Sequence, residues 1–114
     1  MITALIRRLV TQGQTVAAIK HTHHPLADER RGDTARFEQA GASPVILAGD
    51  GEAVLWTAAA CRRLSFKTPA DVLNEFNVDV VLIEGFKSYD RWPRINAADV
   101  RSVEEAIALL DRIP

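Results

Sequence analysis

The chain has 114 residues, 47% of them hydrophobic, so it can bury one core but is too short for two ordinary domains. Fourteen basic and fifteen acidic residues leave a formal net charge of −1, which excludes the broad positive field that attracts nucleic acids or anionic membranes. Arg7 and Arg8 interrupt the first apolar run, so that run is neither a signal peptide nor a membrane-spanning segment. The single cysteine, Cys61, fits a reducing compartment. We therefore expect one cytoplasmic domain over residues 1–114.

Helix and strand patterns alternate from the N-terminus. Apolar residues recur at helical spacing over residues 2–12, and Gly13 follows where a helix would end. Residues 15–19 are β-branched or small, as in a strand buried on both faces, and this strand should end near Lys20. The polar and charged segment 21–33 predicts a long loop.

The middle of the chain predicts a helix followed by a hairpin. Residues 34–40 suit a helix that ends at Gly41. Residues 44–48 and 53–57 read as strands, and the Gly49-Asp50-Gly51 sequence between them is typical of a hairpin turn.

One more helix and strand, and then a final helix, complete the predicted elements. Thr68 suits an N-cap before a short helix over residues 69–76. Residues 78–83 form the most hydrophobic strand candidate, which runs directly into Glu84. Ser102 suits the cap of the final helix.

This alternation predicts an α/β fold with a mostly parallel sheet flanked by helices. Ligands of such folds bind beyond the carboxyl ends of the strands. The two most unusual polar clusters, residues 20–24 and 84–87, both follow predicted strands. The sequence therefore predicts a ligand site at this edge of the sheet.

The first cluster is Lys20-His21-Thr22-His23-His24. In an extended chain His21 and His23 project to the same side, so the two imidazoles could share a ligand. A metal site would need a third ligand, and the candidates are His24, Asp28 and Asp33. In the other interpretation these histidines are ordinary polar residues of a loop.

The second cluster, Glu84-Gly85-Phe86-Lys87, places a carboxylate at the sheet edge. Glu84 could orient a water molecule or a metal-bound phosphate, and Gly85 would allow close approach of the backbone. Alternatively, Glu84 and Lys87 form a solvated ion pair, and Gly85 is a turn residue. Asp33 and Arg36 lie one helical turn apart, so they could pair locally or serve as an acidic and a basic ligand group.

Three segments in this order carry a resemblance to a known family: Val16–His24, Gly32-Asp33-Thr34 with Ala40-Gly41-Ala42, and Val80–Lys87. With them, the chain from Ile2 to about Ile95 resembles the MobB family of molybdopterin-guanine dinucleotide biosynthesis proteins. The resemblance implies a P-loop fold that binds GTP and Mg²⁺, a homodimer and at most a weak GTPase. It also implies an adapter role toward the MobA-like guanylyltransferase that joins GMP to molybdopterin.

The resemblance implies roles for individual residues as well. Asp33 and Glu84 would be the catalytic and metal-binding residues, which support Mg²⁺ or the attacking water. Lys20 or Lys87 would contact phosphates of the nucleotide or of the cofactor. The other residues expected to bind GTP or molybdopterin are His21, His23, Arg36 and Gly85.

The sequence departs from the family at its start. A MobB-like chain should begin with a strand and a G-x-x-x-x-G-K-[ST] loop, and this motif is absent from the sequence. Met1–Ile6 looks like the helix that follows such a loop. We therefore expect an N-terminally truncated chain that lacks an inner strand, with unpaired backbone groups on its neighbours and negligible GTP hydrolysis. Two alternative functions stay open: an interaction module that has lost nucleotide binding, and a small metal-binding protein that uses the histidines.

Overall fold

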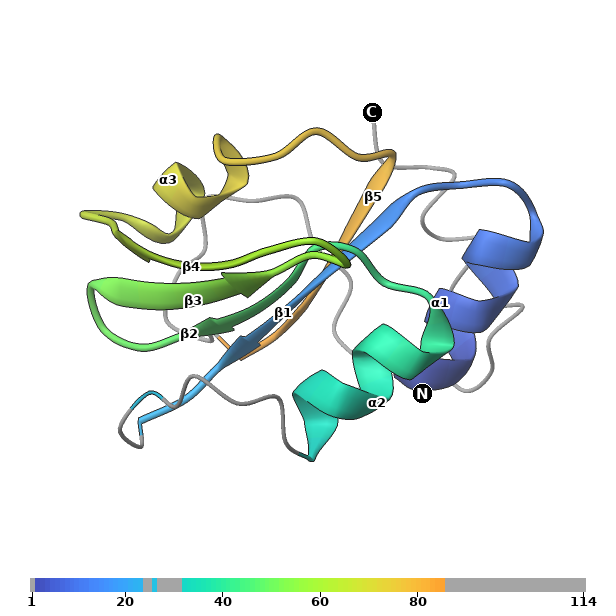
Figure 1. The fold of residues 1–114 in the computed structure, drawn as a ribbon, viewed down its shortest axis with the longest axis horizontal. Helices are drawn as coiled ribbons and strands as arrows, with labels where there is room; N and C mark the ends of the chain where they lie inside the picture. Colours follow the sequence, from blue (N-terminus) through green and yellow to red (C-terminus); the bar gives the residue numbers. More distant parts are fainter. Residues whose placement is uncertain (1, 24–25, 27–31, 86–114) are drawn as a thin grey trace.

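A computed structural model of the chain describes residues 2–23, 26 and 32–85, and one five-stranded sheet runs through this part (Figure 1). Helices pack on both faces of the sheet, α1 and α2 on one face and α3 on the other. The elements in chain order are α1 (Ile2–Thr11), β1 (Val16–His21), α2 (Asp33–Ala40), β2 (Val45–Ala48), β3 (Glu52–Trp56), β4 (Cys61–Ser65), α3 (Pro69–Leu73) and β5 (Val80–Glu84).

The strand order in the sheet is β4-β3-β2-β1-β5. β1 pairs in parallel with β2 on one side and with β5 on the other. β3 is antiparallel to both β2 and β4, so of these five strands only β3 runs against the rest. The predicted α/β class, with a mostly parallel sheet flanked by helices, is thus confirmed.

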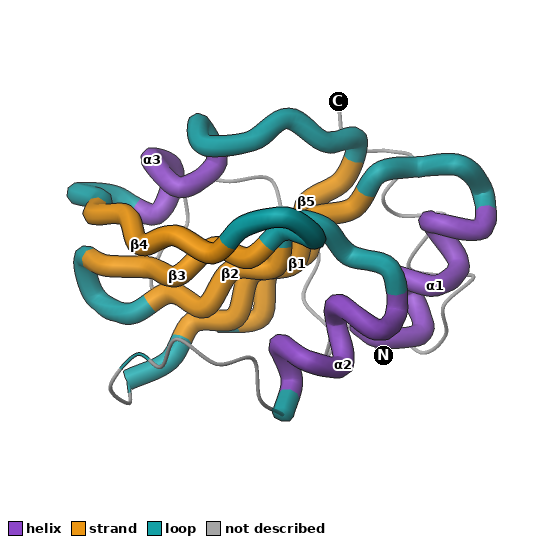
Figure 2. The backbone as a smooth tube through the Cα atoms, viewed as in Figure 1, coloured by secondary structure: helices purple, strands orange, loops and turns teal. Residues whose placement is uncertain are grey.

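Alternate residues of β1 divide the core into two layers. Ala18 faces α1 and α2, whereas Ile19 faces the opposite side together with Val72 of α3. Figure 2 shows the same division, with helices on either side of the strands. Because the side chains of a strand alternate between faces, Lys20 leaves β1 on the α1–α2 side and His21 leaves it on the α3 side.

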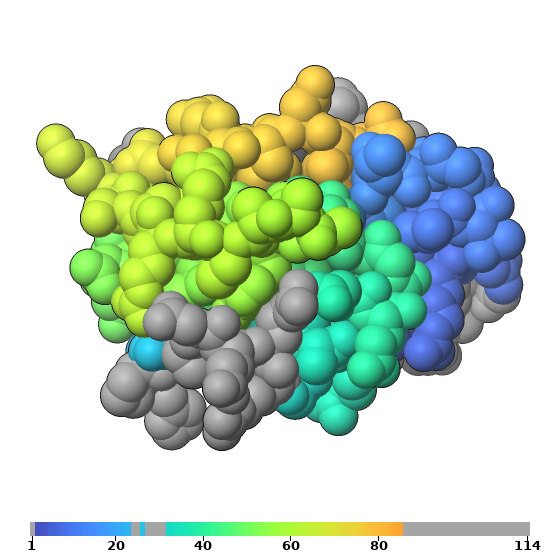
Figure 3. All heavy atoms as spheres, viewed as in Figure 1, coloured from blue at the N-terminus to red at the C-terminus, as the bar shows by residue number. Residues whose placement is uncertain are grey.

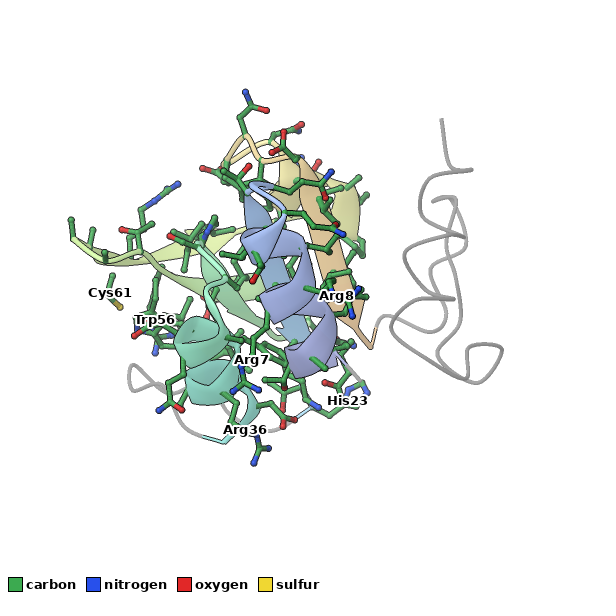
Figure 4. All side chains as sticks on the ribbon, turned by 90° about the vertical axis from the view of Figure 1, so that its right-hand side faces the viewer. Arg7, Arg8, His23, Arg36, Trp56 and Cys61 are labelled. Atoms are coloured by element: carbon green, nitrogen blue, oxygen red, sulfur yellow. The ribbon has the colours of Figure 1, made fainter. Side chains whose placement is uncertain are left out.

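Helix α1 buries the face that its apolar spacing predicts. Leu5, Ile6 and Leu9 are each at most 6% exposed, and Arg7 and Arg8 lie on its exposed side (Figure 4). The helix packs against α2, and α1, α2 and the β3–β4 hairpin follow one another across the face shown in Figure 3. None of the helices in the described ranges is long and apolar enough to cross a membrane.

A reciprocal pair of hydrogen bonds fixes β1 against β5 at their N-terminal ends. The backbone N–H of Thr15 donates to Asp79 Oδ2, and the backbone N–H of Asp79 donates to Thr15 Oγ1, each over 2.9 Å. This register makes Lys20 and Glu84 direct partners at the other end of the strands. The expectation of unpaired backbone groups beside a missing inner strand is wrong for β1, because β1 is bonded on both sides, to β2 and to β5.

Two elements differ from the prediction. β4 escapes the sequence analysis because its residues are mostly exposed and lack an apolar alternation, and its pairing with β3 holds it in the sheet. Arg62 and Arg63 on this outer strand discourage pairing with other chains. α3 ends at Leu73, three residues earlier than expected. The predicted final helix after Ser102 lies outside the described residues.

Candidate functional site at the carboxyl ends of the strands

Lys20, Asp33 and Glu84 meet at the carboxyl ends of β1 and β5, and we call them the edge triad. Lys20 Nζ lies 2.9 Å from Glu84 Oε1 and 3.0 Å from Asp33 Oδ2. Lys20 and Glu84 reach this position as register partners, and Asp33 reaches it as the first residue of α2. The structure therefore brings together three of the residues that the sequence analysis assigns to a ligand site.

The charges of the edge triad stabilise one another. The carboxylates raise the pKa of Lys20, and its hydrogen bond to Glu84 is the largest cause. The pKa of Asp33 is lowered, first by its hydrogen bond with Arg36 and then by that with Lys20. The three side chains of the triad are between 28% and 43% exposed, so a ligand can reach them from solvent. Because the raised pKa of Lys20 and the lowered pKa of Asp33 both favour the charged forms, the two side chains are charged at neutral pH.

Arg36 extends the edge triad along α2. Its Nη2 contacts Asp33 Oδ1, which confirms the local pair, one of the two interpretations that the sequence leaves open. The N-terminal end of α2 also favours a negative charge at Asp33. Arg36 is well exposed and lies at the same end of the molecule as His23 (Figure 4). A second basic group is therefore accessible at this edge.

His21 and His23 meet Asp50 on the other side of the same edge, and we call these three residues the histidine cluster. His21 Nε2 donates to Asp50 Oδ1 over 2.9 Å, and His23 Nδ1 lies 3.7 Å from Asp50 Oδ2. The two imidazoles are in edge-to-face contact, with ring centroids 4.8 Å apart. The hydrogen bond from His21 is the largest cause of the lowered pKa of Asp50. The prediction that the two imidazoles project to one side is confirmed.

Asp50 is the member of this cluster that the sequence analysis missed. It lies in the turn between β2 and β3, 29 positions from His21, where the sequence indicates only a turn residue. Of the three ligands considered instead, His24 and Asp28 lie outside the described residues, and Asp33 belongs to the edge triad. Asp50 could be identified once β1 and β2 are known to be parallel neighbours, because this pairing places the turn after β2 beside the residues after β1.

Gly85 lies where β5 ends, close to His21. Its φ of +108° favours glycine, and a Cβ at this position would lie 2.5 Å from His21 Cβ. The interpretation of Gly85 as a turn residue is therefore confirmed, and the close approach at this position is to His21 of the same chain. Lys87, the other lysine assigned to the site, lies outside the described residues.

Two further residues lie away from this edge. Trp56 is only 4% exposed, so it is a packing residue of β3, and Cys61 is its exposed partner on β4. Figure 4 places both at a distance from His23 and Arg36. Neither therefore belongs to the candidate site.

The two groups of side chains offer different chemistry. The edge triad combines two carboxylates, which suit Mg²⁺, with an ammonium group, which suits phosphate. The histidine cluster combines imidazole nitrogen with carboxylate oxygen, a set that first-row transition metals prefer. Because Lys20 and His21 are consecutive in β1, the two groups lie on opposite sides of the strand. The edge thus carries two separate groups of side chains rather than one ring.

The chain matches the model of the family described as molybdopterin guanine dinucleotide synthesis protein B over residues 1–112. It is 36% identical over 87 residues to a protein of Methanocaldococcus jannaschii provisionally described as a molybdopterin-guanine dinucleotide biosynthesis adapter protein, a match that covers 75% of this chain and 36% of that protein. It is 34% identical over 88 residues to the molybdopterin-guanine dinucleotide biosynthesis adapter protein of Haemophilus influenzae, which covers 76% of this chain and 49% of that protein. The chain thus spans less than half of the length of each relative. No solved structure gives a significant match.

Proposed function

Since the chain belongs to the molybdopterin guanine dinucleotide synthesis protein B family, we propose that it is an adapter domain in the biosynthesis of molybdopterin-guanine dinucleotide and that its edge triad contributes to a site for GTP and Mg²⁺. In this proposal the domain assists a MobA-like guanylyltransferase that attaches GMP to molybdopterin. It acts as a homodimer in the cytoplasm and is at most a weak GTPase.

The edge triad is the observation that carries this proposal. The carboxylates of Asp33 and Glu84 both lie within 3.0 Å of one cationic atom, Lys20 Nζ, so the fold already gathers them around a positive charge. Mg²⁺ is held by carboxylate and phosphate oxygens, and when bound it neutralises phosphate charge. Asp33 and Glu84 would hold the ion, while Lys20 and Arg36 would contact phosphate oxygens.

Residues next to the edge triad have subsidiary parts in the proposal. Gly85 would offer backbone contacts to the nucleotide or the molybdopterin directly after Glu84, while His21 already fills the space that a side chain of residue 85 would take. Lys87 would add a phosphate contact from the segment that follows. His21 and His23 have the weaker claim to contact this ligand, because they face Asp50 on the other side of β1.

Titration calorimetry with GTP and Mg²⁺ tests the proposal, both on the 114-residue chain and on the product of the reading frame with any codons upstream of Met1 included. A phosphate-binding loop supplies most of the affinity for phosphates, so we expect tight binding only by a form that contains such a loop. In that form Asp33→Asn and Glu84→Gln should each weaken Mg²⁺-dependent binding by about tenfold or more, the equivalent of one lost charged contact.

Glu38→Gln is the matched control, because Glu38 is an exposed carboxylate of α2 outside the edge triad. Equal affinities for all three variants would refute the assignment of Asp33 and Glu84. Tight binding by the 114-residue chain itself would require a different phosphate site.

A second function, that of an interaction module without nucleotide, is favoured by one observation. Lys20 and Arg36 together balance the charges of Asp33 and Glu84, so the edge is electrostatically satisfied without Mg²⁺. Capture of the purified guanylyltransferase by this chain in nucleotide-free buffer would support this function. A strict requirement for GTP in the same capture experiment would exclude it.

A further inference from the structure

We propose that His21, His23 and Asp50 form a binding site for a divalent transition metal ion, with Zn²⁺ as the reference ion, separate from the proposed nucleotide site. One ligand atom from each side chain can be chosen so that all three lie within 4.8 Å of one another. Among the residues that the structure describes, no other group of three histidine, cysteine or acidic side chains lies this close together. The fold creates this cluster, because β1 supplies the first histidine and the β2–β3 turn supplies the carboxylate.

The side chains of the cluster lie near the spacing of a metal site, with a different oxygen of Asp50 beside each imidazole. Bonds of about 2.0–2.2 Å from Zn²⁺ to nitrogen and oxygen place neighbouring ligand atoms of a tetrahedron about 3.4 Å apart. The separation of His23 Nδ1 from Asp50 Oδ2 is 3.7 Å, near this value. The separation of His21 Nε2 from Asp50 Oδ1 is 2.9 Å, because these atoms share a hydrogen bond. Metal binding requires this contact to open slightly, with loss of the proton between the two atoms.

The cluster combines one fixed ligand with two adjustable ones. The side chain of His21 is only 12% exposed, and Gly85 packs directly against it. The side chains of His23 and Asp50 are 80% and 73% exposed, so they can change rotamer without disturbing the core. Small adjustments of these two side chains can therefore complete the coordination around the nitrogen of His21.

The donor atoms select the class of metal. Two imidazoles and one carboxylate suit zinc and its first-row neighbours, whereas Mg²⁺ takes oxygen ligands. Three protein ligands leave one tetrahedral position for water or for a group on a partner molecule. The edge triad offers oxygen ligands only, on the opposite side of β1, so the two sites should discriminate between ions.

Calorimetric titration of the purified, metal-free 114-residue chain with Zn²⁺ tests the proposal, without nucleotide. We expect one Zn²⁺ per chain, with no competition from a large excess of Mg²⁺. Cobalt in place of zinc should give the visible absorption of a four-coordinate site. His23→Ala and Asp50→Asn should each weaken binding by about tenfold or more, the low end of the effect of losing a ligand.

Glu52→Gln is the matched control, because Glu52 is an exposed carboxylate two residues from Asp50 on the same hairpin. Both test substitutions fall on exposed side chains, and circular dichroism spectra should show that the variants are folded. The proposal is overturned if the chain binds no stoichiometric Zn²⁺, or if the test variants bind it as the control does. Since no GTP is present, either result is independent of the nucleotide proposal.

Discussion

Lys20→Met gives the most direct test of how the edge triad is held together. Methionine keeps a flexible side chain of similar length, so the apolar stem still packs while the ammonium group is lost. The substitution leaves the carboxylate of Asp33, at the start of α2, and that of Glu84, at the end of β5, without the ammonium group between them. We expect the variant to be destabilised by this unbalanced negative charge.

The structure sets the size of the effect. An oxygen of each carboxylate lies within 3.0 Å of Lys20 Nζ. These two oxygens are therefore at most about 6 Å apart, and at this separation two negative charges repel by about 0.7 kcal/mol in bulk water. At a dielectric constant near 20 the repulsion is about 3 kcal/mol. The side chains are partly exposed, which favours the lower part of this range. We therefore expect Lys20→Met to lower the free energy of unfolding by about 1–2 kcal/mol at pH 7.

The effect should depend on pH in a defined direction. The folded-state pKa of Asp33 is lowered, so its stabilising contribution is present above the ordinary carboxyl pKa and is lost as pH falls through the lowered value. The pKa of Lys20 is raised, so its contribution is present below its ordinary pKa and is lost only as pH rises through the raised value. The difference between wild type and Lys20→Met should therefore be full at pH 7 and shrink below about pH 4.

Urea denaturation followed by circular dichroism at pH 7 and at pH 3 measures this difference. Lys67→Met is the control, because Lys67 is an exposed lysine away from the triad, and it should change stability by less than about 0.5 kcal/mol. The reasoning is refuted if Lys20→Met equals the control at pH 7, or if its effect is the same at both pH values.

Two further predictions concern packing. Ile6→Ala should lower the free energy of unfolding, measured by urea denaturation, by about 2–5 kcal/mol, because Ile6 is fully buried between α1 and the sheet. Val10→Ala, on the exposed side of α1, should lower it by less than about 1 kcal/mol. Similar losses for the two variants would contradict the assigned core. Gly85→Ala should lower the melting temperature more than Gly13→Ala does, because both glycines have positive φ but only Gly85 would bring its Cβ against His21. Equal shifts would show that this contact relaxes freely.

Elements with local signals could be predicted from the sequence. The apolar spacing of α1 and the Gly49-Asp50-Gly51 turn each depend on neighbouring residues, and the structure confirms both. β4 could not be predicted in this way, because Arg62 and Arg63 join the sheet only through pairing with β3. β4 is stabilised by its pairing with β3, and the residues of β4 alone show no pattern that predicts a strand.

In the candidate site, too, some residues could be predicted from local sequence patterns, whereas others depend on the order of the strands. Lys20 and Glu84 could be assigned to one edge, because both follow apolar strands and parallel strands end together. The pairing of His21 with Asp50 could not, because it depends on which strand lies next to β1. Resemblance to a family located the segments, but the strand order decided which side chains meet.

The hydrogen-bonded pair Thr15–Asp79 has a consequence for how the length of the chain can vary. Thr15 and Asp79 are 64 positions apart, and Lys20 and Glu84 are also 64 positions apart. Residues added to or removed from the loops between the two strands leave both pairs matched. One residue inserted inside β5 would turn Glu84 toward the α3 face and away from Lys20, because strand side chains alternate. Homologous chains should therefore differ in length in the loops, while the spacing from Thr15 to Lys20 equals that from Asp79 to Glu84.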